Sequence, residues 1–221
     1  MTSSVHKLCV VTGSRAEYGL LSSLLRKIEE AKEFELQLVV TGSHLSPEFG
    51  LTYKHILEDG YKIDRKVEVL MSSDSPTGIS KSMGIASFSF ADVWETLEPH
   101  MIIVLGDRFE IFAAVSASLP FNIPIAHIHG GEITEGAIDD SLRHCLTKMS
   151  CLHFTSTEEY RRRVIQLGEQ PDFVHNVGAI GIDRIIDCDL LNKAEIEEKL
   201  NFSFGPKNLL ITFHPVTKEK K

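Results

Sequence analysis

Short apolar runs that alternate with segments of helical periodicity are the feature that most restricts the fold of this chain. Each run is almost continuously hydrophobic, as expected for parallel strands that are covered on both faces. The expected strands are Leu8–Thr12, Leu36–Thr41, Val67–Leu70, Met101–Leu105, Ile123–Ile128, Leu152–Thr155, Phe173–Val177 and Leu209–Phe213. The expected helices cover residues 17–31, 46–59, 77–97, 108–119, 138–149 and 158–167. This order predicts an α/β fold with a doubly wound parallel sheet.

Residues 187–221 do not continue this alternation. Residues 187–206 are a polar, linker-like stretch that ends in Phe-Gly-Pro, and the apolar run Leu209–Phe213 opens a new strand shortly before Lys221. We therefore expect one domain over residues 1–186, followed over residues 187–221 by a linker and the truncated start of a second domain. The orphaned strand would expose an apolar edge that promotes association.

The net charge of −8 argues against a surface that binds polyanions, since nucleic-acid-binding proteins need a basic face. An anionic ligand would therefore be held by a local cluster of Arg and His. The cysteines show no Cys-x-x-Cys spacing and are expected to be buried thiols in a reducing compartment; they are Cys9, Cys145, Cys151 and Cys188. Because the sequence shows no signal-peptide core and no apolar run of membrane-spanning length, we expect a cytoplasmic protein that binds neither nucleic acid nor a membrane.

Ligands of such a sheet bind beyond the carboxyl ends of the strands, so the loops at those ends are the candidate sites. In the first loop, Thr12-Gly-Ser-Arg-Ala-Glu17, Ser14 is expected to cap the next helix, with Glu17 completing a capping box. Gly13 allows close backbone approach, and Arg15 is placed to bind a phosphate at the helix N-terminus. The alternative is a well-capped helix with a solvated arginine. The loop matches neither Gly-x-Gly-x-x-Gly nor the Walker pattern.

The second loop, Gly106-Asp-Arg-Phe-Glu110, follows the strand Met101–Leu105. Asp107 has the position of a helix N-cap with Glu110 as its box partner, and this interpretation fits the local pattern best. Alternatively, Asp107 serves in proton transfer or in the recognition of a substrate hydroxyl. In that case the adjacent Arg108 would favour the ionised carboxylate.

The third loop, His127-Ile-His-Gly-Gly-Glu132, concentrates acid, base and anion-binding groups between a strand and a helix. His127 and His129 are two residues apart on the expected strand and would project from one face. Gly130 and Gly131 permit a positive φ or a close backbone approach. Because His127, His129 and Glu132 also resemble a set of zinc ligands, a metal-dependent hydrolase is an open alternative. We rank it below anion chemistry, since the same segment carries an arginine.

The helix after this loop supplies further candidates. Its apolar stripe is expected to face the core and consists of Ile138, Leu142, Cys145 and Met149. Asp139, Arg143 and His144 would then point away from the core, with Asp139 one turn before Arg143. The structural alternative is an acid-rich helix start with a surface Asp–Arg pair.

A fourth loop, His214-Pro-Val-Thr217, follows the last expected strand and has a polar tip. Residues 176–184 are a further segment that could line the cleft, although their glycines would also serve a tight join between strand and helix. The remaining histidines are assigned to the surface or to satisfied packing. Among them, His44 is the one that directly follows the second expected strand.

Together these loops resemble the hydrolysing UDP-N-acetylglucosamine 2-epimerases, in the branch that feeds sialic-acid-type sugars. The blocks that carry the resemblance are residues 13–18, 106–110, 127–132 with 138–144, and 214–217. Members of that family are markedly longer and have two Rossmann-like domains in the glycosyltransferase-B arrangement, with the substrate in the cleft between them. The resemblance implies that this chain is the first half of such a fold. It implies a UDP-sugar ligand, no cofactor, and a homo-oligomer (dimer or tetramer) at full length.

The resemblance also implies a reaction. UDP-N-acetylglucosamine would release UDP and give N-acetylmannosamine through a 2-acetamidoglucal intermediate. Arg15 and Arg108 match positions that hold the diphosphate, and Gly13 and Ser14 are included with them as substrate-binding residues. His214 matches a histidine on the nucleotide side, at the start of the second domain.

Asp107 and Asp139 match carboxylates that are proposed as catalytic in the family. The third such carboxylate falls at His129 in this sequence. This departure alters which residue serves as acid and which as base, or it marks a branch of the family that acts on a related substrate, such as a UDP-2,4-diacetamido-trideoxyhexose.

The chemistry explains why these residue types are wanted. The C2 proton of the sugar is not next to a carbonyl, so UDP must leave first or ahead of proton removal. Arginines and helix N-termini would stabilise the departing diphosphate, and a carboxylate or imidazole would take the proton. We assign proton transfer to Asp107, Asp139 and His129.

The other members of the catalytic set act around these groups. Arg143 and His144 would orient Asp139 and the sugar, and Glu132 is included in the same set. A non-catalytic module that binds a nucleotide sugar is the remaining alternative. We expect the 221-residue chain to fold its first domain but to show little activity.

Overall fold

The computed structural model describes residues 5–212 and contains one seven-stranded sheet. The strand order is β3-β2-β1-β4-β5-β6-β7, and every adjacent pair is parallel. The strands are β1 (His6–Thr12), β2 (Phe34–Thr41), β3 (Arg65–Val67), β4 (Met101–Leu105), β5 (Ile125–Ile128), β6 (Leu152–Thr155) and β7 (Val174–Asn176). The chain runs outward from β1 in both directions, which is the doubly wound topology that the alternation predicts.

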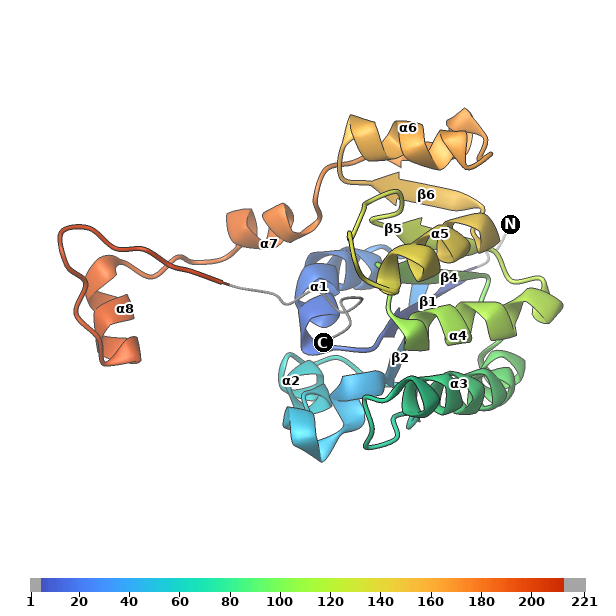
Figure 1. Ribbon diagram of the computed structural model, residues 1–221, viewed down its shortest axis with the longest axis horizontal. Helices are drawn as coiled ribbons and strands as arrows, with labels where there is room; N and C mark the ends of the chain where they lie inside the picture. The colour runs from blue at the N-terminus through green and yellow to red at the C-terminus, as the bar shows by residue number, and fades with distance from the viewer. Residues whose placement is uncertain (1–4, 213–221) are drawn as a thin grey trace.

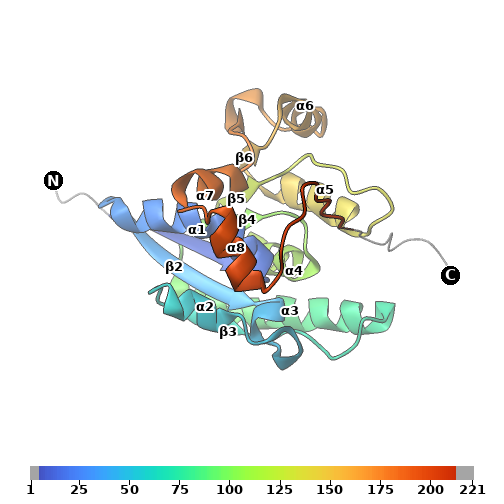
Figure 2. The same ribbon diagram turned by 90° about the vertical axis from the view of Figure 1, so that its left-hand side faces the viewer.

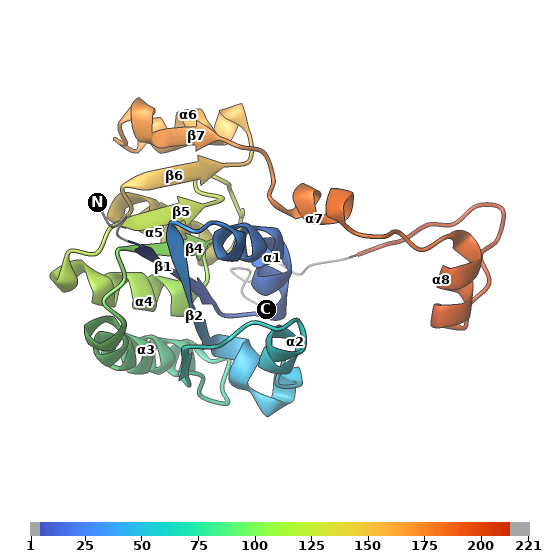
Figure 3. The same ribbon diagram turned by 180° about the vertical axis from the view of Figure 1, so that it is seen from behind.

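Helices cover both faces of this sheet. They are α1 (Arg15–Glu30), α2 (Tyr53–Glu58), α3 (Pro76–Leu97), α4 (Phe109–Ser118), α5 (Asp139–Met149), α6 (Glu158–Gln166), α7 (Gly181–Asp187) and α8 (Lys193–Leu200). Figure 1 looks onto the face that carries α3, α4 and α5, and Figure 3 looks onto the opposite face, where α1 lies. Seen toward the sheet edge, α1 and α3 lie on opposite sides of β2 (Figure 2).

The core consists of two hydrophobic clusters, one on each face of the sheet. Cys9 and Val11 belong to the cluster under α3, α4 and α5, whereas Val10 between them belongs to the cluster under α1 and α2. On β4, Ile102 and Ile103 divide between the two clusters in the same way. Successive side chains of a strand point to opposite faces, so a strand buried on both faces must be apolar at every position. This requirement explains the near-continuous apolar runs of the sequence.

Two expected strands differ from the structure. The run Val67–Leu70 contributes only Val67 to β3, which begins at Arg65 because its partners on β2 are Val39 to Thr41. Residues 209–212 form no strand, and Leu209, Leu210 and Ile211 are exposed; Phe213 lies outside the described residues. A strand needs a neighbour for its N–H and C=O groups, and apolarity alone does not supply one.

The expected helix over residues 46–59 is also shorter than the pattern suggests. Short 3-10 turns at Gly42–Leu45 and Pro47–Phe49 precede α2, which begins at Tyr53. Gly50, between the second of these turns and α2, has a left-handed φ of 81°, a conformation that interrupts a helix. The other predicted helices match α1, α3, α4, α5 and α6 within two residues at each end.

The α1 face of the sheet is only partly covered over its second half. An apolar groove of about 610 Å³ lies there, lined by β4, β5 and β6 residues such as Ile103, Ile128 and Phe154. Leu20 and Leu24 of α1 form its other side. None of the candidate site residues lines this groove.

The C-terminal part of the described chain leaves the sheet after β7. The helix α7 lies beside α1, where Arg184 Nη1 donates to the Gly19 carbonyl at 3.1 Å, and α8 lies apart from the sheet (Figures 1 and 3). The predicted domain boundary after residue 186 falls within α7, and it stays a prediction.

The prediction of buried cysteines is wrong for most of them. Cys9 is buried on β1, and burial raises the pKa of its thiol. Cys145, Cys151 and Cys188 are exposed. In α5 the exposed position of Cys145 follows from a rotation of the helix that is described with the site below. No helix within residues 5–212 has both the length and the hydropathy to cross a membrane.

Two phenylalanines on α3 give a matched test of this core. Phe90 is fully buried and packs on Trp94, whereas Phe88 is 81% exposed on the same helix. We expect Phe90→Ala to lower the free energy of unfolding by about 3–5 kcal/mol. The Phe88→Ala control should change it by less than about 0.5 kcal/mol. Urea denaturation measures both; equal losses would contradict the burial assigned to α3.

Candidate active site

The candidate residues lie beyond the carboxyl ends of neighbouring strands. β1, β4, β5 and β6 are consecutive in the sheet and parallel, so the loops that follow them meet at one edge. These loops and the helices after them contain the first three predicted blocks. His214, the predicted nucleotide-side histidine, lies outside the described residues.

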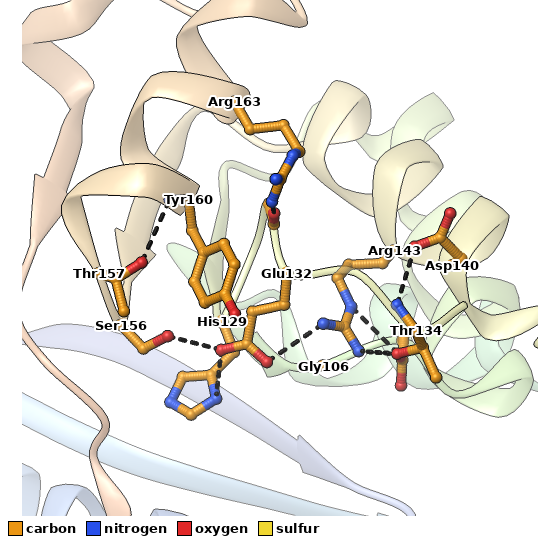
Figure 4. Close-up of polar contacts among 12 residues, drawn as sticks. Gly106, His129, Glu132, Thr134, Asp140, Arg143, Ser156, Thr157, Tyr160 and Arg163 are labelled. Carbon is orange, nitrogen blue, oxygen red and sulfur yellow. Dashed lines mark hydrogen bonds and ion pairs between the residues drawn. The ribbon is translucent and has the colours of Figure 1, made fainter.

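Arg143 is the centre of this edge. Its side chain is only 8% exposed and contacts Asp107 through Nε at 3.1 Å and again through Nη2. It also donates to Glu132 Oε2 at 3.2 Å and to Thr134 Oγ1 at 3.1 Å (Figure 4). A buried guanidinium is stable only when its charge is paired and its donors are used. Arg143 of α5 thus joins the loop after β4 to the loop after β5.

This geometry corrects the orientation predicted for α5. The buried positions are Arg143, Leu146 and Thr147, while Ile138 and Cys145 are exposed. The predicted apolar stripe is therefore not the buried face of the helix. The structural alternative, a surface Asp139–Arg143 pair, is wrong, since Arg143 is buried and contacts Asp107 and Glu132. The ion pairs at the strand ends decide the rotation of the helix.

The interpretation of Asp107 as a helix cap is wrong as well. The N-cap position of α4 is Arg108, and it makes no side-chain cap hydrogen bond. Asp107 turns toward Arg143, and Glu110 pairs with Arg108, whose Nε lies 2.6 Å from Glu110 Oε1. Asp107 and Arg108, although adjacent in sequence, therefore pair with different side chains: Asp107 with Arg143, and Arg108 with Glu110.

Arg108 forms an ion pair with a buried acidic residue, Glu110. Glu110 is fully buried, and a Cβ on Gly42 would lie 2.5 Å from its Oε1, so only glycine fits at that position, where φ is also +58°. Burial lowers the pKa of Arg108, but the negative charges of Glu110, Glu17 and Asp139 outweigh it and raise that pKa overall. Asp139 itself is the first residue of α5, which follows the loop after β5.

The first loop is capped as predicted, with one difference. Ser14 Oγ accepts from the Glu17 backbone N–H at 3.3 Å, which confirms the cap. The Glu17 carboxylate accepts from the N–H of Gly13 at 2.6 Å, one residue before the position that a capping box requires. Burial, partly offset by Arg108, raises the pKa of Glu17 to about 8.

His44 belongs to the same buried network. Its Nε2 lies 3.1 Å from Thr12 Oγ1, and its Nδ1 lies 2.8 Å from Thr52 Oγ1. Burial, with a smaller contribution from the charge of Arg108, lowers its pKa to about 4. This histidine is a neutral packing group next to the first and second loops.

Arg15 lies apart from the Arg143 cluster, on the exposed first turn of α1. It lines an open pocket of about 480 Å³ together with Gly19, Gly181 and Arg184. Arg184 was not among the predicted site residues, although the segment 176–184 was noted for its position. Arg15 and Arg184 thus bring two guanidinium groups to one open pocket beside α1, a surface suited to an anion.

The two histidines of the third loop have different environments. β5 ends at Ile128, and His129 has a left-handed φ of 63°. His127 is fully buried: its Nε2 donates to the Gly106 carbonyl at 2.7 Å, and Thr147 Oγ1 lies 3.2 Å from its Nδ1. Burial lowers the pKa of His127 to about 4. The expectation that both imidazoles project from one strand face is wrong, because the strand ends between them.

His129 contacts the catalytic candidates instead. Its Nδ1 lies 3.2 Å from Glu132 Oε1, and Ser156 donates to the same oxygen at 2.7 Å (Figure 4). The pKa of His129 is lowered by burial and by the charge of Arg143, against the opposing charge of Glu132. The buried Nε2 has no hydrogen-bond partner within residues 5–212.

The remaining predicted residues lie around this cluster. Asp139 is the first residue of α5 and is half-buried. His144 lies one turn from Asp140, with Nε2 and Oδ2 3.8 Å apart, so its recorded partner is Asp140 and not Asp139. Within the described residues, no group of three or more His, Cys, Asp or Glu side chains is arranged to hold a metal ion.

A doubly wound sheet with arginines and carboxylates at its carboxyl edge defines an α/β domain of the nucleotide-binding class. The chain belongs to the UDP-N-acetylglucosamine 2-epimerase family, whose model matches residues 26–221. The resemblance identified from the four loops is thereby confirmed.

Two similar relatives come from bacteria. The chain is 44% identical over 214 residues to the GDP/UDP-N,N'-diacetylbacillosamine 2-epimerase (hydrolyzing) of Campylobacter jejuni, covering 97% of this chain and 56% of the relative. It is 43% identical over 211 residues to the polysialic acid biosynthesis protein P7 of Escherichia coli, covering 96% and 54%. The chain thus spans about half the length of these relatives.

Solved structures show the same fold. A UDP-N-acetylglucosamine 2-epimerase crystal structure superposes with a TM-score of 0.77 at 16% identity, covering 90% of this chain and 53% of that chain. The S. aureus MnaA–UDP co-structure gives a TM-score of 0.75 at 21% identity, covering 89% and 52%. The predicted Rossmann-like half of a glycosyltransferase-B-like fold is confirmed.

Substitution of Arg143 tests whether its ion pairs stabilise the folded state. Arg143→Ala would leave Asp107 and Glu132 without their buried cation and should lower the free energy of unfolding by about 3–5 kcal/mol. Arg162→Ala is the control, because Arg162 is 74% exposed and pairs with Glu158 at 3.6 Å on the surface. It should cost less than about 1 kcal/mol. A small loss for Arg143→Ala in urea denaturation would contradict the assignment.

The raised pKa of Glu17 gives a test by pH. The folded state holds the Glu17 proton more tightly than the unfolded state, so this contribution to stability is complete below pH 4.5 and is lost as the pH rises toward 8. Glu17→Gln mimics the protonated carboxyl. Between pH 5 and 9 the parent should lose about 2–5 kcal/mol more stability than this variant. Parallel losses in calorimetry would show that Glu17 titrates normally.

Proposed function

We propose that the protein containing this chain is a hydrolysing UDP-N-acetylglucosamine 2-epimerase, which converts UDP-N-acetylglucosamine and water to N-acetylmannosamine and UDP. The observation that carries the proposal is the Arg143 cluster, which brings Asp107, Glu132 and, through Glu132, His129 together at one sheet edge. Family membership and two relatives named as hydrolyzing 2-epimerases support it.

The diphosphate would be held on the β1 and β4 side of the edge. Arg108 uses Nε to bind Glu110 and keeps 37% of its side chain exposed, so its Nη groups are available to phosphate oxygens. Arg15 lies at the N-terminus of α1, where Ser14 already caps one N–H and other N–H groups face the ligand. These groups stabilise the negative charge that develops on the leaving UDP.

Inversion at C2 needs acid–base groups on both faces of the sugar, because a proton leaves one face and another arrives on the opposite face. The C1–O bond breaks and its electron pair stays with the diphosphate, while the C2–H pair forms the C1=C2 bond of the 2-acetamidoglucal. Water then adds across this double bond with its proton at C2. Asp107, Asp139 and His129 share these transfers. Arg143 acts by orienting Asp107 and Glu132.

A related substrate is the second candidate. Relatives at 44% and 33% identity are named N,N'-diacetylbacillosamine 2-epimerases, which supports a UDP-2,4-diacetamido-2,4,6-trideoxyhexose in the same reaction. His129, at the position where the family resemblance expects a carboxylate, is the sequence feature consistent with a distinct branch. The cleavage chemistry is the same for both sugars.

Product analysis tests the proposal and separates its alternatives. The full-length protein is incubated with UDP-N-acetylglucosamine or its diacetamido analogue, and the released sugar is identified by NMR. N-acetylmannosamine or the C2-inverted diacetamido sugar is the expected product. Binding of UDP without cleavage would instead indicate a binding module.

The two carboxylates are tested by neutral substitutions. Asp107→Asn and Asp139→Asn should each lower kcat by about 10²–10⁴-fold, the usual contribution of one acid–base group. Asp92→Asn, at an exposed position of α3, is the control and should leave kcat unchanged. If either site variant kept turnover within about threefold of the parent, that residue would have no part in proton transfer.

A further inference from the structure

Glu132 and Ser156 form a line of contacts that ends at His129. Ser156 Oγ lies 2.7 Å from Glu132 Oε1, and the same oxygen lies 3.2 Å from His129 Nδ1. We propose that His129 Nε2 is the base that removes the C2 proton, and that Glu132 and Ser156 are positioning residues that fix its tautomer and its orientation. This inference rests on the proposed function and assigns one step of it.

The contacts determine which ring nitrogen carries the proton. The Glu132 carboxylate lies 3.2 Å from Nδ1 and would repel a lone pair there, so its charge favours the proton on His129 Nδ1. In the neutral ring Nε2 then has a free lone pair, and within residues 5–212 this buried atom has no partner. A ring nitrogen without a partner can accept a proton from a substrate that reaches it.

His153 shows the contrast within the same chain. It pairs with Glu169 through Nε2 at 3.2 Å, and its buried Nδ1 also has no partner within residues 5–212. It lies on β6, before the carboxyl edge, and is almost fully buried. His129 keeps 15% of its side chain exposed and follows the end of a strand. The His153–Glu169 contact is a hydrogen bond, whereas His129 and Glu132 form an ion-pair contact, and of the two histidines His129 is the one at the carboxyl edge.

The backbone around His129 is held in one conformation. The His129 N–H donates to the Phe154 carbonyl at 2.8 Å, which ties its left-handed φ of 63° to β6. Gly131 packs against α6, where a Cβ would lie 2.5 Å from the Tyr160 carbonyl oxygen, and Arg163 donates to the Gly131 carbonyl (Figure 4). A left-handed non-glycine residue is uncommon and persists only where its surroundings fix it.

The charges facing His129 suit a base that gains a proton. Glu132 faces it directly, Arg143 lies behind Glu132, and buried His127 is the neighbouring imidazole. Burial keeps the ring neutral at pH 7, since it lowers the pKa of His129. When C2 gives its proton to Nε2, Glu132 stabilises the imidazolium, while Arg143 shares the charge of Glu132 and prevents an excess of negative charge in the free enzyme.

NMR of the 221-residue chain tests the pair without any substrate. Long-range proton–nitrogen spectra of the histidines should show His129 as the Nδ1–H tautomer, and Glu132→Gln should lower its pKa. The matched control, Glu169→Gln, should lower the pKa of His153 and leave that of His129 unchanged. An Nε2–H tautomer at His129, or a pKa of His129 that does not respond to Glu132→Gln, would overturn the inference.

Kinetics of the full-length protein test whether His129 removes the C2 proton and whether Glu132 and Ser156 position it. Glu132→Gln should lower kcat by about tenfold or more with KM nearly unchanged, and the acid limb of the pH profile should move to lower pH with the pKa of His129. Ser156→Ala should lower kcat by a smaller factor, and Ser156→Thr, which keeps the hydroxyl, should restore it. Glu169→Gln should leave both kcat and the acid limb unchanged.

The outcomes for this inference and for the proposed function are distinguishable. UDP release with C2 inversion, together with an unshifted acid limb in Glu132→Gln, would overturn the role of His129 and leave the function in place. Absence of UDP release in the parent would overturn the function and with it the role of His129 as base. The NMR result would in that case still decide whether Glu132 fixes the tautomer.

Discussion

The ion pairs of Arg143 are the interaction on which this edge of the molecule depends. One nearly buried guanidinium from α5 contacts Asp107 after β4 and Glu132 after β5, and so fixes the relative position of two loops and a helix. Burying three charged groups is unfavourable unless each finds its partner, so the cluster is stable only as a complete unit. The same contacts hold Asp107 and, through Glu132, His129 beside one another at this edge.

The parts of the fold that follow from local pattern could be predicted from the sequence. Strands such as β1 and β4 are apolar at every position because both of their faces are buried, and this pattern needs no knowledge of distant residues. The strand-end location of the site follows from the parallel order, by a rule that holds for doubly wound sheets in general. The Ser14 cap is equally local, since its partner Glu17 is three residues away.

The parts that failed depend on contacts between distant residues. Asp107 has the local pattern of a helix cap, but its partner Arg143 is 36 residues further along the chain. An apolar stripe predicted the wrong face of α5, because pairing a buried arginine outweighs the exposure of Ile138 and Cys145. His127 and His129 share a spacing that implies one face, but the strand ends at Ile128. Spacing does not reveal where a strand ends or which charges meet across a sheet.

Epimerisation through UDP elimination makes a demand that simple hydrolysis does not: the original C2 proton must leave the sugar. The most direct measurement is therefore the reaction of the full-length protein with unlabelled UDP-N-acetylglucosamine in deuterated water, followed by NMR of the released sugar. The account predicts one deuterium at C2 of the C2-inverted product in every turnover, with UDP released in equal amount. Release of a sugar that retains its C2 hydrogen would contradict it, since the acid–base groups assembled by Arg143 would then have no proton to transfer.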